Sequence, residues 1–307
     1  MKDFSRYFQV EEADAGSRLD VFLAGRLKTS RRQVHRLLDD RTVSLDGRRE
    51  HHKGAILAPG QQIEVSSFQP PEDAQVLPQP DVPLNVLASG DGWIALDKPP
   101  GIPVHPLKSD ESQTLLNAAV ARYPQIQNVG EGGLRSGVVH RLDVDTSGVI
   151  LIATQQLTWE RLRRAISEHR AQKIYRAIVA GELKGSDRLV LDLHVAQHSP
   201  ARVKVVDAQS LPKPAGTRRC DLSWKSVQHT KDATLLEISL GTGFLHQIRA
   251  MMAHIGHPVL GDKTYGQNDP DVPRQMLHAR SIRIEEIYAE SPEPEDFVGA
   301  LSSFNLR

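Results

Sequence analysis

The sequence predicts a two-domain α+β protein, because helical and strand patterns occur on both sides of a proline-rich stretch. Before that stretch, apolar residues recur at helical spacing over 17–38, and a short strand pattern follows at 62–65. After it, short β-branched runs such as 149–152 alternate with helical runs such as 247–255. We therefore expect a small N-terminal α/β domain, a linker and a larger domain, at residues 1–66, 67–83 and 84–307.

The composition indicates a globular protein without an apolar membrane segment. The chain of 307 residues is 39% hydrophobic, which is enough for a substantial core, and carries 38 basic and 38 acidic residues. No run approaches the roughly 18 apolar residues of a membrane span, and the N-terminus lacks the apolar centre of a signal peptide. The lone Cys220 excludes an internal disulfide and a cysteine metal site. We expect a cytoplasmic protein.

Two helices are expected near the N-terminus. Ser17 is placed to cap a first helix whose apolar positions include Leu19 and Leu23, and Ser30 with Gln33 forms the pattern of a capping box for a second helix. An Asp46-Gly47 pair then predicts a hairpin turn between short strands.

This N-terminal segment is also basic. Residues 17–53 contain ten basic residues and five acidic ones, so their net charge is +5 although the whole chain is neutral. Arg31, Arg32 and Arg36 are expected to face solvent on the second helix. Such a face can serve solubility alone, but the concentration of charge on one helical hairpin favours contact with RNA. The stretch "RLDVFLAGRLKTSRRQVHRLLDDRTVSLDG" resembles the ribosomal S-four-like RNA-binding module, which implies binding to structured RNA.

A polar insert, "HRLDVDTSG", lies between the apolar runs 138–139 and 149–152, both of which are expected as strands. Loops held between rigid strands often carry catalytic or binding groups, so Asp143 is a candidate site residue. The alternative is that Asp143 is satisfied by Arg141 or by amides of the turn.

Further candidates lie in three other stretches. Lys98 follows a short strand in "WIALDKPPGIPVHP", which also contains His105, and Tyr175 lies on a probable strand after a helix. Taken alone, Lys98 is better explained as a solvated lysine in a proline-rich turn, and Tyr175 as a residue of the core. The histidines of "LHQIRAMMAHIGHPV", including His246, lack the spacing and acidic partners of a metal site, so we expect no metal there. The Met residues of that stretch are expected in the core.

Taken together, the four stretches resemble the RluA-type pseudouridine synthases. The family's motifs are present in order as "DKPPGIPVHP", "HRLDVDTSGVILIA", "KIYRAIVAG" and "LHQIRAMMAHIGHPVLGDKTYG". The resemblance implies a catalytic domain built on a mostly antiparallel, bifurcated sheet with flanking helices. It also implies isomerisation of uridine to pseudouridine in RNA without cofactor or metal.

The resemblance also implies roles for individual residues. Asp143, and not Asp145, matches the catalytic aspartate, which either adds to the anomeric carbon or removes a ribose proton. Arg141 matches the residue that enters the space left by a flipped base. Tyr175 matches a catalytic residue that stacks on uracil and is a candidate to help remove the carbon-5 proton. The positions that would line the RNA-binding cleft, in contact with RNA or in structural roles, are Lys98, His105, His246 and Arg249.

One position departs from the family pattern. The fourth motif of the family begins G-R-T-H-Q, and the resemblance implies that its first arginine pairs with the catalytic aspartate, whereas this chain has Phe244 there. Arg249, Arg135 and Lys173 are the candidates to replace it. Arg249 comes first, because its place on the expected helix is offset from the apolar positions.

Two other functions are compatible with parts of the sequence. Phe244 is compatible with a non-catalytic RNA-binding or ribosome-assembly factor on a synthase scaffold, and Asp143 with a hydrolase acting on another glycosidic bond. Intact Asp143, Arg141 and Tyr175 favour the synthase. Its expected substrate is ribosomal RNA of the large subunit, with transfer RNA as the alternative, and we expect a monomer.

Overall fold

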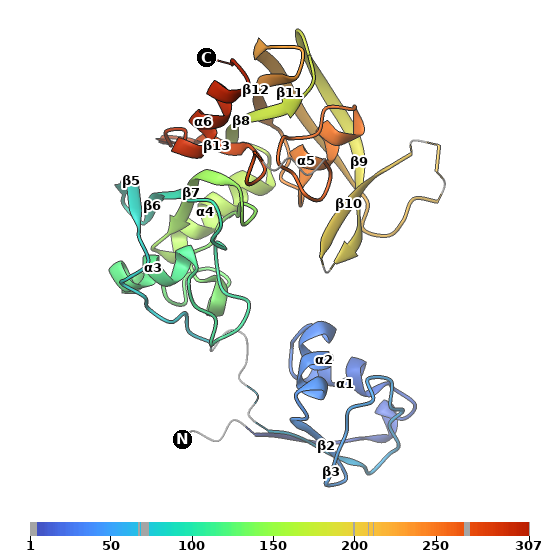
Figure 1. Cartoon of the computed structure of the whole chain (residues 1–307). Coiled ribbons are helices and arrows are strands. Elements are labelled where there is room, and N and C mark those ends of the chain that lie inside the picture. The colour runs from blue at the N-terminus through green and yellow to red at the C-terminus, as the bar shows by residue number, and fades with distance from the viewer. Residues whose placement is uncertain are drawn as a thin grey trace. The chain divides into compact units, whose positions relative to one another are not determined.

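The computed structural model describes residues 5–66, 68, 74–198, 200–207, 209–210, 212–266 and 271–306. The chain forms two compact units (Figure 1). The first comprises residues 1–75 with 132–134, and the second comprises 76–131 with 135–307.

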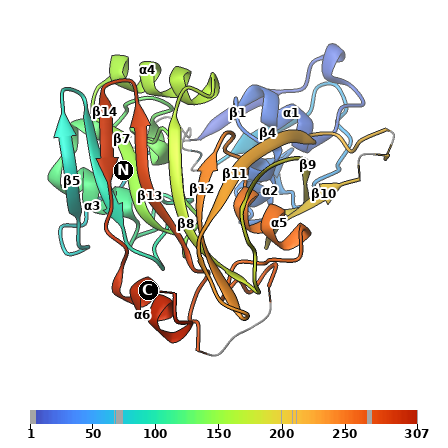
Figure 2. The same cartoon turned by 90° about the horizontal axis from the view of Figure 1, so that it is seen from above.

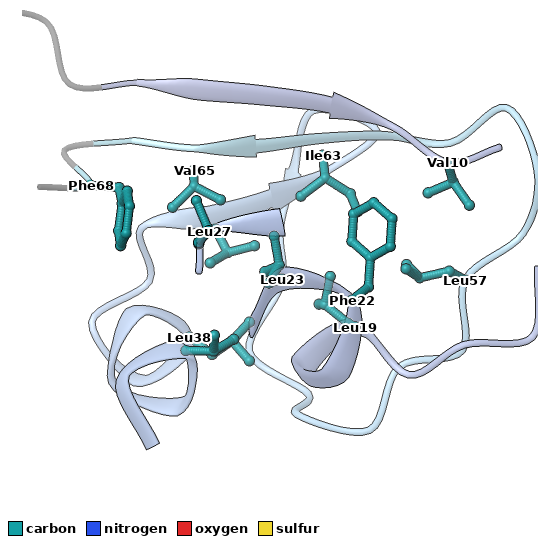
Figure 3. Packing of buried hydrophobic residues seen from close by; sticks show 12 residues of the cluster. Val10, Leu19, Phe22, Leu23, Leu27, Leu38, Leu57, Ile63, Val65 and Phe68 are labelled. Atoms are coloured by element: carbon teal, nitrogen blue, oxygen red, sulfur yellow. The ribbon is translucent and has the colours of Figure 1, made fainter. Parts of the chain in front are cut away.

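The first unit is a four-stranded antiparallel sheet with two helices packed on it. The strand order is β1 (Arg6–Gln9), β4 (Gln62–Val65), β2 (Val43–Leu45) and β3 (Arg48–Arg49). The helices are α1 (Leu19–Arg26) and α2 (Arg31–Asp39), after a 3-10 turn at Glu12–Asp14. Figure 3 shows the core between helices and sheet, where side chains such as Leu23, Leu38 and Ile63 point toward one another and are almost fully buried. Burying these apolar side chains stabilises the unit.

Most local expectations for this unit are confirmed. Ser30 and Gln33 form the capping box of α2, and Asp46 and Gly47 have the positive φ angles of a tight hairpin turn. The predicted cap at Ser17 is wrong, since α1 begins after Arg18 without a side-chain cap. The reason is tertiary: the carbonyl of Ser17 accepts a hydrogen bond from the amide of Leu57, which keeps the backbone extended for one more residue.

The second unit is built on a ten-stranded, mostly antiparallel sheet, as the sequence led us to expect (Figure 2). Its order is β10 (Ala201–Val206), β9 (Ser186–His198), β11 (Arg218–His229), β12 (Ala233–Leu240), β8 (Gln172–Ala180), β13 (Leu277–Ile284), β7 (Ser147–Ala153), β6 (Trp93–Lys98) and β5 (Asn85–Gly90). β13 runs parallel to β7 at residues 278–279, and residues 281–284 of β13 pair with β14 (Ile287–Glu290). The sheet therefore forks at β13.

The helices that accompany this sheet in the described residues are α3 (Leu115–Arg122), α4 (Gln156–Ser167), α5 (Gln247–His254) and α6 (Glu295–Ser303), with a 3-10 turn at Pro124–Ile126. A further 3-10 turn, Gly133–Arg135, includes residues of both units. In α5, Ile248, Met251 and Met252 are buried, and Gly256 follows with a positive φ, so the expected core role of this stripe is confirmed. Phe297 of α6 packs with Ile178 of β8 in a second apolar cluster.

Two expectations about segment boundaries are wrong. Val76 and Val82, expected in the linker, are buried in the second unit, and the amide and carbonyl of Val76 bond to the side chain of Gln127. The unit boundary therefore lies at residue 75, while residues 67 and 69–73 of the expected linker lie outside the described residues. The run at 138–139 forms only an isolated bridge between Val138 and Ile152.

Candidate active site

The loop that carries Asp143 is held by backbone contacts. It leads directly into β7, and its turn is closed by a hydrogen bond from the amide of Thr146 to the carbonyl of Asp143. The carbonyl of Val144 accepts a hydrogen bond from the amide of Gly101, whose positive φ closes the proline-rich turn. The turn after β6 therefore fixes the backbone beside Asp143.

Lys98 reinforces the same contact from inside the protein. It is fully buried, and its Nζ donates hydrogen bonds to the carbonyls of Pro99, Ile102 and Val144 at 2.7–2.8 Å. Burial lowers the pKa of Lys98 to about 7, although the negative charge of Asp145 opposes the shift. Lys98 does not line the cavity described below, and none of its side chain is exposed to solvent. Of the two roles left open by the sequence, the structural one fits.

Asp143 opens onto a cavity of about 370 Å³, a volume within the range of small-ligand sites. Val139, Leu142, Leu240 and Leu277 supply apolar wall, and β8 contributes Lys173 and Tyr175. The expected site residues that line this cavity are Asp143, Arg141, Tyr175, His105, His246 and Arg249. The structure therefore brings together residues that lie more than a hundred positions apart.

Arg249 forms an ion pair with Asp143. Its Nη1 lies 2.8 Å from Oδ2 of Asp143, whose side chain is 22% exposed. The other two candidates are engaged elsewhere, because Arg135 pairs with Glu131 at 3.1 Å and Lys173 donates to the carbonyl of Thr242. The sequence-based choice of Arg249 is confirmed.

The far side of the Arg249 guanidinium meets a second carboxylate, that of the fully buried Asp262. Nε and Nη2 of Arg249 donate to its two oxygens at 2.7 and 2.8 Å, and Nη2 also donates to Oγ1 of Thr264 at 3.2 Å. Burial acts to lower the pKa of Arg249, but the bonds and charges of Asp262 and Asp143 outweigh it and raise that pKa. Asp262 lies in the fourth motif, at the end of "LHQIRAMMAHIGHPVLGDKTYG", but it was missed because nothing in the sequence indicated that its carboxylate binds Arg249.

Tyr175 is buried in the cavity wall. Burial, together with the negative charge of Asp143, raises the pKa of its phenol above the ordinary value, so Tyr175 is neutral at physiological pH. A neutral ring offers a stacking surface and a hydroxyl donor, and is a poor general base.

The histidines around the cavity are held neutral by burial. His246, in a left-handed conformation at the start of α5, contacts the Tyr265 hydroxyl through Nδ1, and its Nε2 lies 3.9 Å from Oδ2 of Asp143. Burial lowers the pKa of His246 and of His105. His140, which the sequence did not single out, also lines the cavity, and burial lowers its pKa to about 3.

Two neighbours of Asp143 are exposed and differ in placement. Arg141 lines the cavity, where its exposed cationic side chain is placed to contact a polyanion. Asp145 is absent from the lining, and its carbonyl accepts a hydrogen bond from Arg274. This difference agrees with the preference for Asp143 over Asp145.

In the first unit, one of the arginines expected to face solvent also takes part in an ion cluster around Asp20. Arg31 donates to the fully buried Asp20 at 2.7 Å, together with Arg18 and His35 at 3.0 and 2.9 Å. Arg31 faces solvent as expected, with about half of its side chain exposed, while its guanidinium also binds Asp20. Arg36 is half-buried, and the Arg32 side chain lies outside the described part of the chain.

The described ranges contain neither a cluster of metal ligands nor a helix suited to span a membrane. There, no three His, Cys, Asp or Glu side chains are grouped closely enough to hold a metal ion together. No helix in those ranges combines the length and apolar character needed to cross a membrane.

The comparisons with known proteins agree with this geometry. Residues 92–254 match the family described as RNA pseudouridylate synthase. The chain is 33% identical to ribosomal large subunit pseudouridine synthase D of Nitrosomonas europaea, over 94% of this chain and 85% of that protein. It is 31% identical to the protein of the same name from Yersinia pestis, over 90% and 85%. The solved structure of human RNA pseudouridylate synthase domain containing 1 is similar in fold, with a TM-score of 0.57 at 22% identity over 74% and 89% of the two chains.

Proposed function

Since this chain belongs to the RNA pseudouridylate synthase family and is thus an isomerase of RNA uridines, we propose that its substrate is ribosomal RNA of the large subunit. Its relatives from Nitrosomonas europaea and Yersinia pestis are named for that substrate. The observation that carries the catalytic part of the proposal is Asp143, partly exposed in a closely lined cavity and held by Arg249.

We propose Asp143 as the catalytic carboxylate. The reaction breaks the bond between N1 of uracil and C1′ of ribose, turns the base, and joins C5 to C1′ with loss of the C5 proton and gain of a proton at N1. A carboxylate can add to C1′ or take the ribose 2′ proton in the first step, and both routes remain open. No water is activated in either route, so a single carboxylate suffices.

The supporting groups follow from the cavity. A uridine must leave its stack to bring C1′ to Asp143, and extrusion costs a few kcal/mol. Arg141 is placed to fill the space that the base leaves, and the neutral Tyr175 ring is placed to stack on the bound uracil. Arg249 stabilises the carboxylate in the orientation it needs before the base arrives.

The two rival functions lose their main support. The non-catalytic alternative depended on Phe244 leaving Asp143 without a cation, but Arg249 supplies the ion pair. The hydrolase alternative needs a second carboxylate to activate water. The other carboxylate that lines the cavity in the described part of the chain, Glu131, is paired with Arg135.

We assign RNA affinity to the first unit as part of the same proposal. The net charge of +5 over residues 17–53 supports it, and phosphate contacts do not require the Arg31 guanidinium to be free. Arg36 remains a candidate contact. The Asp20 cluster orders the two helices that display these side chains.

The test is the isomerisation itself, followed as tritium released from RNA carrying uridine labelled at C5. We expect Asp143→Asn to keep the fold and RNA affinity and to lower the single-turnover rate by more than about 1000-fold, because the amide is not nucleophilic. Asp145→Asn is the matched control and should retain near wild-type activity. An Asp143→Asn enzyme within tenfold of wild type would overturn the assignment.

A further inference from the structure

We propose that Asp262 is a positioning residue for the isomerisation: by occupying most of the Arg249 guanidinium, it restricts Arg249 to a single contact with Asp143 and leaves the second oxygen of Asp143 available to the ribose. This inference rests on the proposed function. It explains how Asp143 is held in a fixed orientation while one of its oxygens stays free to react.

The division of the guanidinium is visible in its contacts. Nε and Nη2 of Arg249 bind Asp262 as a two-point fork, and only Nη1 reaches Asp143, at Oδ2. Thr264 accepts a further hydrogen bond from Nη2, and the Tyr265 ring lies 5.3 Å from the guanidinium carbon. Arg249 therefore cannot turn its fork toward Asp143 without leaving a buried carboxylate unpaired, which is costly.

Asp262 is itself held rigidly. Its Oδ1 accepts hydrogen bonds from the backbone amides of Thr264 and Tyr265, at 2.9 and 3.2 Å. Gly261, immediately before it, has a positive φ, and a Cβ there would lie 2.0 Å from the carbonyl oxygen of Arg274. The backbone thus places Asp262 against Arg249 through contacts that do not involve Asp143.

The charge balance has a chemical consequence. Arg249 is shared by two carboxylates. The negative charge of Asp143 is therefore neutralised less than it would be if Arg249 bound Asp143 alone through two hydrogen bonds. Within the described residues, Oδ2 of Asp143 accepts the bond from Arg249 and no hydrogen bond is found to Oδ1. A carboxylate held at one oxygen is oriented, while the other oxygen can attack or accept a proton.

The competing explanation is that Asp262 only stabilises the fold. A structural role would change stability and RNA binding, and its loss would add to the loss of Arg249. A positioning role acts through Arg249, so the two losses would not add. A double-mutant cycle therefore separates the explanations.

The experiment measures single-turnover tritium release at saturating enzyme, RNA affinity and thermal stability for Asp262→Asn, Arg249→Lys and the double variant in the full chain. We expect Asp262→Asn to lower the rate by about 100-fold, the cost of a small misplacement of a catalytic group, with RNA affinity unchanged. In the Arg249→Lys background the same substitution should cost little more. Thr264→Val, which removes an uncharged contact to the same nitrogen, is the matched control and should stay near wild type.

A second readout does not depend on activity. The Nε–H proton of Arg249, held against Asp262, should give a resolved NMR signal that shifts or disappears in Asp262→Asn and persists in Thr264→Val. An Asp262→Asn rate within threefold of wild type, or a full additive loss in the double variant, would overturn the inference. Absence of tritium release from the wild type would instead overturn the proposed function, while the NMR signal would still show whether Asp262 holds the guanidinium.

Discussion

Two ion clusters among the described residues each contain a fully buried aspartate, but they combine arginine and aspartate in opposite proportions. In the first unit, one carboxylate, Asp20, is surrounded by Arg18, Arg31 and His35. In the second, one guanidinium, Arg249, is shared by the carboxylates of Asp143 and Asp262. The first arrangement satisfies its anion completely, which suits a structural role. The second leaves one anion partly satisfied beside a cavity, which suits a catalyst.

The pKa shifts follow the same division. Burial acts to raise the pKa of Asp20, but hydrogen bonds from Arg18, His35 and Arg31 outweigh it and lower that pKa far below the usual range. In the second cluster the arginine is the shared group, and its pKa is raised. In each cluster, the single residue that is surrounded by opposite charges has its charged form stabilised: Asp20 in the first cluster and Arg249 in the second.

The largest expected effect comes from replacing the shared cation. Arg249→Lys should lower the single-turnover rate by about 100-fold or more, because an ammonium cannot bind two carboxylates with a planar fork. The matched substitution in the other cluster, Arg31→Lys, should leave activity unchanged and cost less than about 1 kcal/mol of stability, since Arg18 and His35 remain. Equal loss of activity in the two variants would contradict the comparison.

An intermediate effect is expected from removing the central anion of the first cluster. Asp20→Asn should lower the free energy of unfolding of the first unit by about 2 kcal/mol, because it removes charged hydrogen bonds in a buried place. The folded-state pKa of Asp20 is lowered, so its contribution is present above the ordinary pKa of an aspartate and is lost as the pH falls below about 4. Urea unfolding followed by methyl NMR signals of the first unit should show the wild type and variant converging at low pH. A difference that grows toward low pH would contradict this assignment.

The smallest effect is expected at Phe244. Phe244→Arg would add a second cation near Asp143 and make the catalytic cluster more like the structural one. Since Arg249 already provides the ion pair, the change in single-turnover rate should be less than about threefold, which is under 1 kcal/mol in barrier. An increase of tenfold or more would show that the ion pair with Arg249 is insufficient.

Local structure was predicted well where the residues that determine it lie within one short segment. The capping box at Ser30, the turn at Asp46-Gly47 and the buried stripe of α5 each depend on neighbours a few residues away. Asp143 and Tyr175 were found because their motifs are specific. The cap at Ser17 and the strand at 138–139 were mispredicted because distant backbone partners decide those conformations.

The sequence by itself determined the fold class, the family and the identity of the candidate catalytic aspartate, since these depend on residue types in a fixed order along the chain. The sequence also offered Arg249 as the first of three candidate partners for that aspartate, and the tertiary structure decided the rest of its surroundings. The tertiary structure buried Lys98 under the Asp143 loop, and it brought Asp143 against Arg249 and the nearby Asp262, so that one cation is divided between two carboxylates. The physical reason is that ion pairing and burial depend on distances in space, and Asp143 and Arg249 lie more than a hundred positions apart in this chain.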